Sequence, residues 1–449
     1  MSSARQIAFD LLRQSHDGQY PLDYWLDLAE PHLRCLSRAD RALVHALVYG
    51  TLRWQRQLDF IIDHLAVKPT KIDPRARIIL RLALFQLYHM DRIPESAAVH
   101  SAVELSKNSR LRWAAGFING LLRQAARRPS LPWPDAVKTP DLALSVNLSF
   151  PRWLTRRWLD RWSNDEVRQL CEAINAIPAI TLRTNTLKTD RATLMGAIQK
   201  EAAQIGTTPY SPEGITLTAL SKPIPQWSSF QQGWFQIQDE AAQLVGHMLA
   251  PQPGETVWDA CAGLGTKTAH LAQLMHNRGR LLASDRSAVK LNRLSHEMQR
   301  LGVTIATPQK LDVIVEDTST LPIFDRIIVD APCSGLGVLQ KNPDGKWRVT
   351  AQELERYQRR QIALLSRTAL HLRPGGVLVY AVCSFEPEEN GAVAKAFLQN
   401  HPDFAIHHGG MRVAADSQPA LLTPEGWLST FPHRHQMDGF FAAAFVKRN

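Results

Sequence analysis

The chain has 449 residues, of which 45% are hydrophobic and 21% charged, a composition typical of a soluble globular protein with more than one domain. Its five cysteines are an odd number without CxxC spacing, which excludes a disulfide framework and indicates reduced thiols in a cytoplasmic protein. No apolar run approaches the roughly 18 residues of a membrane span, so we expect no membrane association. The net charge of +10 favours a polyanionic partner.

Residues 1–130 carry apolar side chains three and four positions apart, as in Ile78, Leu82 and Phe85, and this spacing predicts an all-helical bundle. Arginines are interleaved with tryptophans along these helices. They fit two interpretations, either contact with the phosphates and bases of a nucleic acid or ordinary solvated helix faces. The predicted basic surface consists of Arg53, Arg56, Arg75, Arg77, Arg81, Arg110, Arg112, Arg123, Arg127 and Arg128.

A proline-rich linker is predicted at residues 131–142, within the stretch RPSLPWPDAVKTPDL, because proline at this density neither continues a helix nor pairs in a central strand. Residues 143–237 then predict a small α+β connecting domain. It begins with a basic, tryptophan-rich helical stretch and continues with strand-like alternation at residues 179–187, 214–217 and 233–237.

In residues 238–449 helical and strand patterns alternate, which predicts an α/β Rossmann-like domain with a parallel sheet covered by helices on both faces. Ligands of such sheets bind at the carboxyl ends of the strands. The predicted strands are residues 256–259, 280–284, 305–310, 326–329, 377–381 and 440–446.

A glycine-containing turn follows the first of these strands, in ETVWDACAGLGTKTAHLAQL. Gly263 and Gly265 let the backbone approach a ligand, and the helix after them presents free N–H groups to an acidic group. Asp285 ends the next strand, where a carboxylate binds a ribose diol, and Asp312 follows the third strand, where it is placed to meet an adenine amino group. These positions predict a nucleoside cofactor, with helix capping as the alternative role of both aspartates. The glycines do not distinguish NAD from S-adenosylmethionine.

Two further strands end in a cysteine followed by a serine, in IIVDAPCSG and in LVYAVCS. Parallel strands would bring these thiols, Cys333 and Cys383, to one edge of the sheet. Asp330 stands just before the first thiol, and a carboxylate at a strand end is costly to bury without a task or a partner. A cysteine taken alone is more often a packing residue, which is the interpretation that we give to Cys35 and Cys171.

A pair of thiols suits methyl transfer to carbon 5 of a cytosine. That carbon is a poor nucleophile, but a thiolate that adds to carbon 6 converts the ring into an enamine able to attack a methyl sulfonium. A second group must then remove the proton from carbon 5 so that the first thiolate can leave. Hydride transfer to a nicotinamide needs no such pair, so the cysteines favour S-adenosylmethionine as the cofactor.

The same motifs resemble a known family. DAPCS, VCS, the CAxxGxKT string, NPDGKW, QDEAA and DGFFAAAFVK resemble the RNA cytosine-5 methyltransferases. The N-terminal sequences RALVHALVYGTLR and FINGLLRQ look like the NusB-like RNA-binding domain of the RsmB branch, which modifies 16S ribosomal RNA. The resemblance spans nearly the whole chain, and the two cysteine motifs together are its most specific part.

The resemblance implies roles for the residues at matching positions. Cys383 would add to carbon 6 of the cytosine, Cys333 would assist proton removal and product release, and Asp330 would contact both the cofactor and the cytosine. Lys267 would point toward the active centre, where a cation lowers a thiol pKa. The cofactor site would comprise Cys261, Ala262, Gly263, Leu264, Gly265, Thr266, Lys267, Asp285, Asp312 and Asp330.

The chain departs from the usual family pattern in the cofactor loop, which reads CAGLGTKT in place of CAAPGGKT. Leu264 replaces a proline and Thr266 a glycine, while Val382 and Asn342 replace the more common threonine and histidine of two other motifs. None of these changes touches the thiol chemistry, and we expect cofactor binding to survive. The 16 histidines show no HExxH or clustered spacing, so no metal is expected.

The expected protein is a monomer that forms 5-methylcytosine in 16S ribosomal RNA with S-adenosylmethionine as methyl donor. Two alternatives stay open. One is the same reaction on transfer RNA or at another site. The other is a non-catalytic RNA-binding factor in ribosome assembly, favoured only by the altered cofactor loop and opposed by the presence of both thiols together with Asp330 and Lys267.

Overall fold

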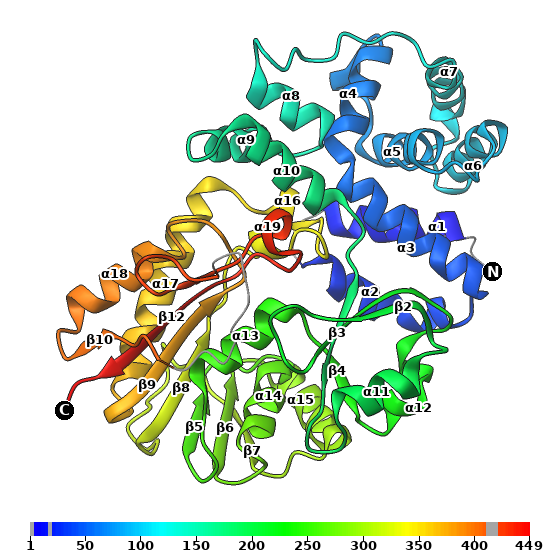
Figure 1. Ribbon diagram of the computed structural model, residues 1–449. Helices are drawn as coiled ribbons and strands as arrows, with labels where there is room; N and C mark the ends of the chain where they lie inside the picture. Colours follow the sequence, from blue (N-terminus) through cyan, green and yellow to red (C-terminus); the bar gives the residue numbers. More distant parts are fainter. Residues whose placement is uncertain (1–3, 17–19, 410–420) are drawn as a thin grey trace. The chain divides into compact units, whose positions relative to one another are not determined.

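The computed structural model describes residues 4–16, 20–409 and 421–449. The chain forms two compact units, shown in Figure 1. The helical unit consists of Met1–Ala176 together with Leu339–Val349, and the sheet unit consists of Ile177–Val338 and Thr350–Asn449. Within the described ranges, no helix has the length and the apolar character needed to cross a membrane.

The helical unit confirms the predicted all-α bundle. Its core helix is α5 (Pro74–His89), whose apolar side chains are buried on nearly every side. Pro74 occupies the first helical position, and the Asp73 side chain accepts a hydrogen bond from the Arg75 amide at 2.8 Å, so the sequence itself starts this helix. The other α-helices of the unit are α1 (Ala4–His16), α2 (Leu22–Arg34), α3 (Arg38–Arg53), α4 (Gln55–Leu65), α6 (Glu95–Asn108), α7 (Ala115–Ala126), α8 (Pro140–Asn147), α9 (Arg152–Leu159), α10 (Asn164–Asn175) and α16 (Gly345–Arg348).

Two of the predicted surface arginines are buried. Arg81 donates to both carboxylate oxygens of Asp59, at 2.8 and 2.7 Å, and Arg53 Nη2 donates to the carbonyl of Gln340 at 2.7 Å. The expectation that Arg53 and Arg81 are exposed was wrong, because a charged side chain can be buried when hydrogen-bond acceptors or an opposite charge surround it. The packing role given to Cys35 was also wrong, since this residue follows the last turn of its helix and is exposed.

The end of the predicted linker is helical. Residues 140–142 open α8, with Pro140 at the first turn, because a proline there sacrifices no intrahelical hydrogen bond. The loop part of the stretch is irregular as predicted.

The segment Leu339–Val349 packs within the helical unit, although its sequence lies between strands of the sheet unit. It contains the NPDGKW motif. The Asp344 carboxylate accepts from the Leu22 amide at 3.1 Å, and Trp347 Nε1 donates to the Leu52 carbonyl at 2.7 Å. The motif therefore forms hydrogen bonds that hold this segment in the helical unit. Nothing in the motif's own sequence indicates this role.

Lys346 of this segment is fully buried. Its Nζ donates to the carbonyls of Arg53 and Ser149, both at 3.2 Å, and to Asn175 Oδ1 at 2.7 Å. The same ammonium lies 3.6 Å from the centre of the Phe150 ring. Three acceptors and a ring face thus replace its hydration shell.

We expect Lys346→Met to lower the free energy of unfolding of the helical unit by roughly 3 kcal/mol, because the substitution leaves buried acceptors unpaired while keeping most of the side-chain volume. Urea denaturation followed by circular dichroism measures the effect. Lys138→Met is the matched control, since Lys138 is exposed. Equal unfolding midpoints for the two variants would contradict this account.

The sheet unit begins with a four-stranded antiparallel sheet in the order β2-β3-β1-β4, which confirms the small α+β domain. The apolar face of this sheet is covered by α11 (Arg191–Ile198), with Leu182, Ile215 and Leu217 in the shared core. The strand β2 was not predicted, because its sequence AAQIGT is short and lacks a clear alternation. The strands are β1 (Ile180–Thr184), β2 (Ala202–Thr207), β3 (Gly214–Leu220) and β4 (Phe235–Ile237).

The second sheet has the order β10-β12-β9-β8-β5-β6-β7, with β11 paired to β12. Strands β5 to β9 are parallel, as predicted, whereas β12 runs antiparallel to β9. The short strands β10 and β11 were not predicted because pairing with β12 stabilises them rather than their own sequence. The strands are β5 (Thr256–Asp259), β6 (Arg280–Asp285), β7 (Ala306–Lys310), β8 (Phe324–Asp330), β9 (Leu372–Val382), β10 (Phe404–Ile406), β11 (Leu428–Ser429) and β12 (Phe441–Lys447).

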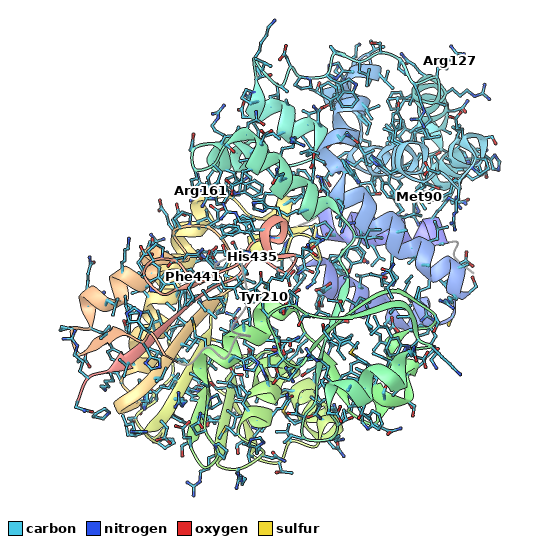
Figure 2. The ribbon with its side chains drawn as sticks, in the orientation of Figure 1. Met90, Arg127, Arg161, Tyr210, His435 and Phe441 are labelled. Atoms are coloured by element: carbon cyan, nitrogen blue, oxygen red, sulfur yellow. The ribbon has the colours of Figure 1, made fainter. Side chains whose placement is uncertain are left out.

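Helices cover both faces of this sheet (Figure 1). In β8, Ile327 and Val329 point to the core shared with α17 and α18, and Ile328 between them points to the core shared with α13 and α14. Phe441, labelled in Figure 2, is the first residue of β12. Its ring lies edge-on to the ring of Tyr380, with 6.3 Å between the ring centres. The helices are α13 (Glu240–Leu249), α14 (Thr266–Leu274), α15 (Ala288–Leu301), α17 (Ala351–Ala369) and α18 (Gly391–Asn400).

Candidate active site

The two cysteine motifs meet at the carboxyl edge of the central strands. Cys333 follows β8, Cys383 follows β9, and their sulfur atoms lie 3.2 Å apart. The hydrogen bond between the thiols, together with burial, raises the pKa of Cys333 well above its ordinary value. Cys333 is therefore a protonated thiol at neutral pH, in contact with the sulfur of Cys383. Parallel neighbours in the sheet explain why residues 50 positions apart in sequence come together.

A partly buried ion pair lies near these thiols. Lys267 Nζ lies 2.6 Å from Asp330 Oδ2, and the lysine side chain is 10% exposed. Burial lowers the pKa of Lys267, but the attraction of Asp330 outweighs it and the pKa lies above its ordinary value. The ammonium also lies 5.2 Å from the centre of the Phe440 ring. Lys267 thus places a positive charge at this edge, paired with the carboxylate of Asp330.

The glycine turn connects β5 to α14. Gly263 and Gly265 both have positive φ, 56° and 83°, and a Cβ on Gly265 would lie 2.6 Å from Leu294 of α15. The Gly263 amide donates to Asp285 Oδ2 at 3.1 Å, and the Ser287 amide donates to Oδ1 at 2.8 Å. Asp285 therefore holds the turn, and the other lone pair of each carboxylate oxygen remains for a ligand.

The remaining predicted cofactor residues occupy different surroundings. Asp312 lies two residues beyond β7, with Oδ1 accepting from the Ile314 amide at 3.1 Å. The Leu264 side chain, which replaces the usual proline, is 46% exposed. Burial raises the pKa of Cys261 far above its ordinary value. A thiol in that state is a poor nucleophile.

Asp259 ends β5 beneath the glycine turn and is fully buried. Its Oδ2 accepts from the Thr268 hydroxyl at 2.7 Å. Burial raises the pKa of this carboxyl to about 7, although the hydroxyl bond and Lys267 lower it. In the unfolded chain an aspartate has a pKa of about 4. At pH values between the unfolded-state and the folded-state pKa, the folded protein therefore binds the proton more tightly than the unfolded chain does.

We therefore expect the stability contributed by Asp259 to be full below about pH 4 and to be lost as the pH rises through the folded-state pKa. Asp259→Asn removes this titration and should raise the Tm relative to wild type more at pH 8 than at pH 5. Thermal melts of both proteins across this interval test the expectation. Parallel pH profiles for the two proteins would show that Asp259 is ionised throughout.

Comparison with known proteins matches three stretches of the chain to described families. Residues 246–446 match "16S rRNA methyltransferase RsmB/F", residues 2–127 match the NusB family, and residues 150–222 match the ferredoxin-like domain of the RsmF/B-like methyltransferases. A "Probable ribosomal RNA small subunit methyltransferase B" of Synechocystis sp. is 36% identical, with 100% of both chains covered. The protein of the same description from Bacillus subtilis is 35% identical over 92% of each chain.

This chain belongs to the RsmB/F family of 16S rRNA methyltransferases. The crystal structure of a methyltransferase homolog from Pyrococcus horikoshii aligns with 69% of this chain and 99% of its own, at 29% identity and a TM-score of 0.60. Another solved structure aligns over 100% of this chain and 99% of its own, at 25% identity and a TM-score of 0.83. The family resemblance and the three-part fold expected from the sequence are confirmed.

The structure adds to the candidate site of this RsmB/F chain a residue that the motif comparison did not single out. Glu389 lies six positions after Cys383 and is fully buried. Its carboxylate bonds to Ser334 and to Ser384, the two serines that directly follow the cysteines. The only sequence signal for Glu389 was the pair of Cys-Ser dipeptides. Two serine hydroxyls next to the candidate catalytic cysteines can donate hydrogen bonds to one common acceptor.

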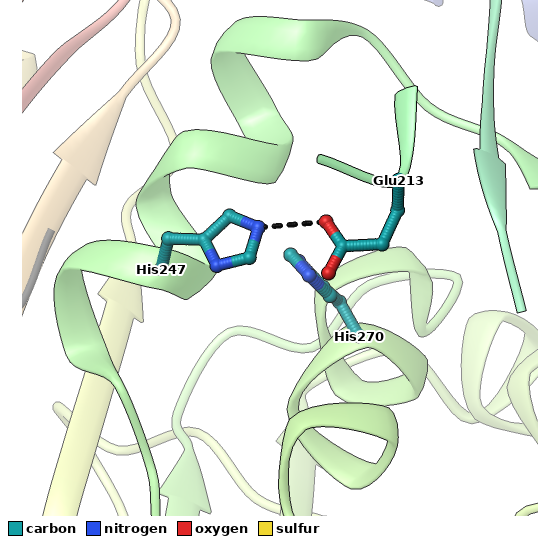
Figure 3. Close-up of side chains that lie close together, drawn as sticks. All are labelled: Glu213, His247 and His270. Carbon is teal, nitrogen blue, oxygen red and sulfur yellow. Dashed lines mark hydrogen bonds and ion pairs between the residues drawn. The ribbon is translucent and has the colours of Figure 1, made fainter. Parts of the chain in front are cut away.

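One cluster elsewhere in the sheet unit has the residue types of a metal site. Figure 3 shows Glu213, His247 and His270, whose candidate ligand atoms lie within 4.8 Å of one another. They are too far apart in sequence for any spacing rule to detect. His247 Nε2 lies 2.8 Å from Glu213 Oε2, so the carboxylate already has a partner.

The charge around this cluster opposes a cation. Burial, followed by the positive charge of Arg183, lowers the pKa of His270 well below its ordinary value. The same guanidinium is attracted to Glu213. Because a buried positive charge already faces the cluster, we assign it no metal. The expectation of a metal-free protein stays a prediction.

Proposed function

We propose that this chain transfers a methyl group from S-adenosylmethionine to carbon 5 of a cytosine in 16S ribosomal RNA. The observation that carries the proposal is the 3.2 Å contact between the sulfurs of Cys333 and Cys383, beside the Lys267–Asp330 pair. Two thiols and a fixed charge at the carboxyl edge of a parallel sheet suit a reaction that forms and then breaks a bond to carbon.

The residues at the glycine turn fit the proposed cofactor. The glycines of the turn let a ligand come close to the backbone, and the first amides of α14 can donate hydrogen bonds to an acidic group of that ligand. Asp285 and Asp312 lie at the ends of β6 and β7, where a nucleoside binds in sheets of this kind. When bound, S-adenosylmethionine supplies an electrophilic methyl group. Asp330 lies between this region and the thiols, and we propose that it contacts both the cofactor and the base.

In the proposed reaction, the Cys383 thiol loses its proton to solvent and Sγ forms a bond to carbon 6 of the cytosine. Carbon 5 then takes the methyl group, and S-adenosylhomocysteine would be the leaving product. Cys333, once it has lost its own proton to solvent, then takes the proton from carbon 5. The electrons of that C–H bond restore the ring double bond, and the bond between carbon 6 and Cys383 breaks. Asp330 holds the polar edge of the ring, and Lys267 keeps Asp330 in place through their ion pair.

The test is methyl transfer from labelled S-adenosylmethionine to protein-free 16S ribosomal RNA, followed by identification of the labelled base. Label recovered as 5-methylcytosine supports the proposal. Label recovered in transfer RNA alone would move the substrate to that class. If no RNA is labelled and calorimetry detects no heat with S-adenosylmethionine, the chain is a non-catalytic assembly factor.

A further inference from the structure

We propose that Glu389 is a positioning residue that holds Cys333 and Cys383 at their working separation by binding the serine next to each of them. The inference rests on the proposed two-thiol reaction and extends it to a residue that touches neither the base nor the cofactor.

The contacts of the carboxylate link the two motifs directly. Oε2 accepts from the Ser334 hydroxyl at 2.5 Å and from the Ser384 hydroxyl at 2.7 Å, and Oε1 accepts from the Ser334 amide at 2.8 Å. Ser334 follows Cys333 and Ser384 follows Cys383, so a single carboxylate bridges the residues adjacent to both thiols. The two hydroxyl oxygens lie 3.4 Å apart as a result.

A second set of contacts anchors Glu389 itself. Gln361 of α17 donates from Nε2 to Glu389 Oε1 and to the Pro332 carbonyl, both at 3.1 Å. The Tyr380 hydroxyl donates to the Glu389 carbonyl at 2.6 Å. Glu389 is therefore tied to α17 and to β9, the strand that precedes Cys383.

The four donors that reach this buried side chain specify a carboxylate. Two hydroxyls, one amide N–H and one Nε2 group all donate, which matches the acceptor capacity of an ionised glutamate. Burial raises the pKa of Glu389, and these hydrogen bonds partly offset that effect. A glutamine would place an NH₂ group where donors already converge, so Glu389→Gln disrupts the arrangement with almost no change in volume.

Another link between the motifs limits the expected damage. The Gly337 amide donates to the Cys383 carbonyl at 3.0 Å, so the backbone still joins the two loops when the carboxylate is lost. We expect Glu389→Gln to loosen the thiol pair without unfolding the sheet. A displacement of about 1 Å at a reacting group costs on the order of 100-fold in rate, so the expected loss of kcat is roughly 10- to 100-fold.

The two serines give variants with different expected signatures. Ser334→Ala loosens the Cys333 side, so RNA covalently bound to the protein should accumulate because release is slowed. Ser384→Ala loosens the Cys383 side, so formation of the adduct itself should slow. Glu389→Gln should lower turnover and also raise the ratio of retained adduct to released product. General destabilisation would lower adduct and product together.

A measurement that needs no reaction tests the geometry. Treatment with diamide removes two electrons and two protons from the Cys333–Cys383 pair and yields a disulfide and the reduced hydrazine, and mass spectrometry of non-reduced peptides follows this linkage. We expect Glu389→Gln to form it several-fold more slowly than wild type. Glu355→Gln is the matched control, because Glu355 is exposed on α17, the helix that carries Gln361.

The outcomes separate the two proposals. If Cys383→Ala methylates RNA as wild type does, the thiol mechanism fails, whatever the diamide result. If methylation depends on Cys383 but Glu389→Gln matches Glu355→Gln in disulfide rate and in adduct ratio, the role of Glu389 is overturned. Unchanged calorimetric affinity for S-adenosylmethionine and an unchanged Tm establish that the variant is folded.

Discussion

Cys383→Ala is expected to lower methyl transfer to RNA by about 10⁴-fold or more, because it removes the atom that activates the cytosine ring. No other thiol can replace it. Cys333 lies 3.2 Å away, and although the substitution removes its hydrogen bond to Cys383, burial still raises the pKa of Cys333. The measurement is the initial rate of label transfer under saturating S-adenosylmethionine.

Two controls give this result its meaning. Cys35→Ala removes an exposed thiol in the helical unit and should leave the rate unchanged. Calorimetry should show that Cys383→Ala still binds S-adenosylmethionine, because the glycine turn and Asp285 do not depend on the thiol. A variant that retains more than about a tenth of the wild-type rate would be incompatible with covalent catalysis by this residue.

Cys333→Ala is expected to make the covalent protein–RNA intermediate accumulate, whereas Cys383→Ala prevents its formation. The variant keeps the nucleophile and should form the bond to carbon 6, but without the second thiol the carbon 5 proton is removed slowly and the RNA stays attached. A band of retarded mobility that survives denaturing electrophoresis and disappears on RNase treatment reports this adduct.

The double variant Cys333→Ala/Cys383→Ala is the decisive comparison. It should form no adduct, because the sulfur that bonds the base is absent. An adduct of equal yield in the double variant would mean that another residue attacks the RNA. Normal turnover by Cys333→Ala with no retained RNA would assign the proton removal to a different group.

The sequence by itself determined most of the elements and their order. Helical spacing in residues 1–130 and strand alternation after residue 238 are local properties, and each element buries the face that its own pattern marks. That Cys333, Cys383 and Asp330 lie at one edge was also predictable, because a parallel sheet delivers the ends of its strands there, whereas Lys267 of α14 was singled out only by the family resemblance. The motif strings added the family, which the comparisons confirmed.

Only the tertiary structure decided which distant side chains meet. Glu389 bridges two serines that lie 50 positions apart in sequence, and the buried position of Lys346 depends on a segment that leaves one unit to pack in the other. Arg53 and Arg81 are buried because the Gln340 carbonyl and the Asp59 carboxylate accept their hydrogen bonds inside the bundle. The sequence around the two arginines does not indicate this burial. Local patterns encode which face of an element is apolar, whereas polar contacts across elements depend on strand register and loop path, which no local pattern contains.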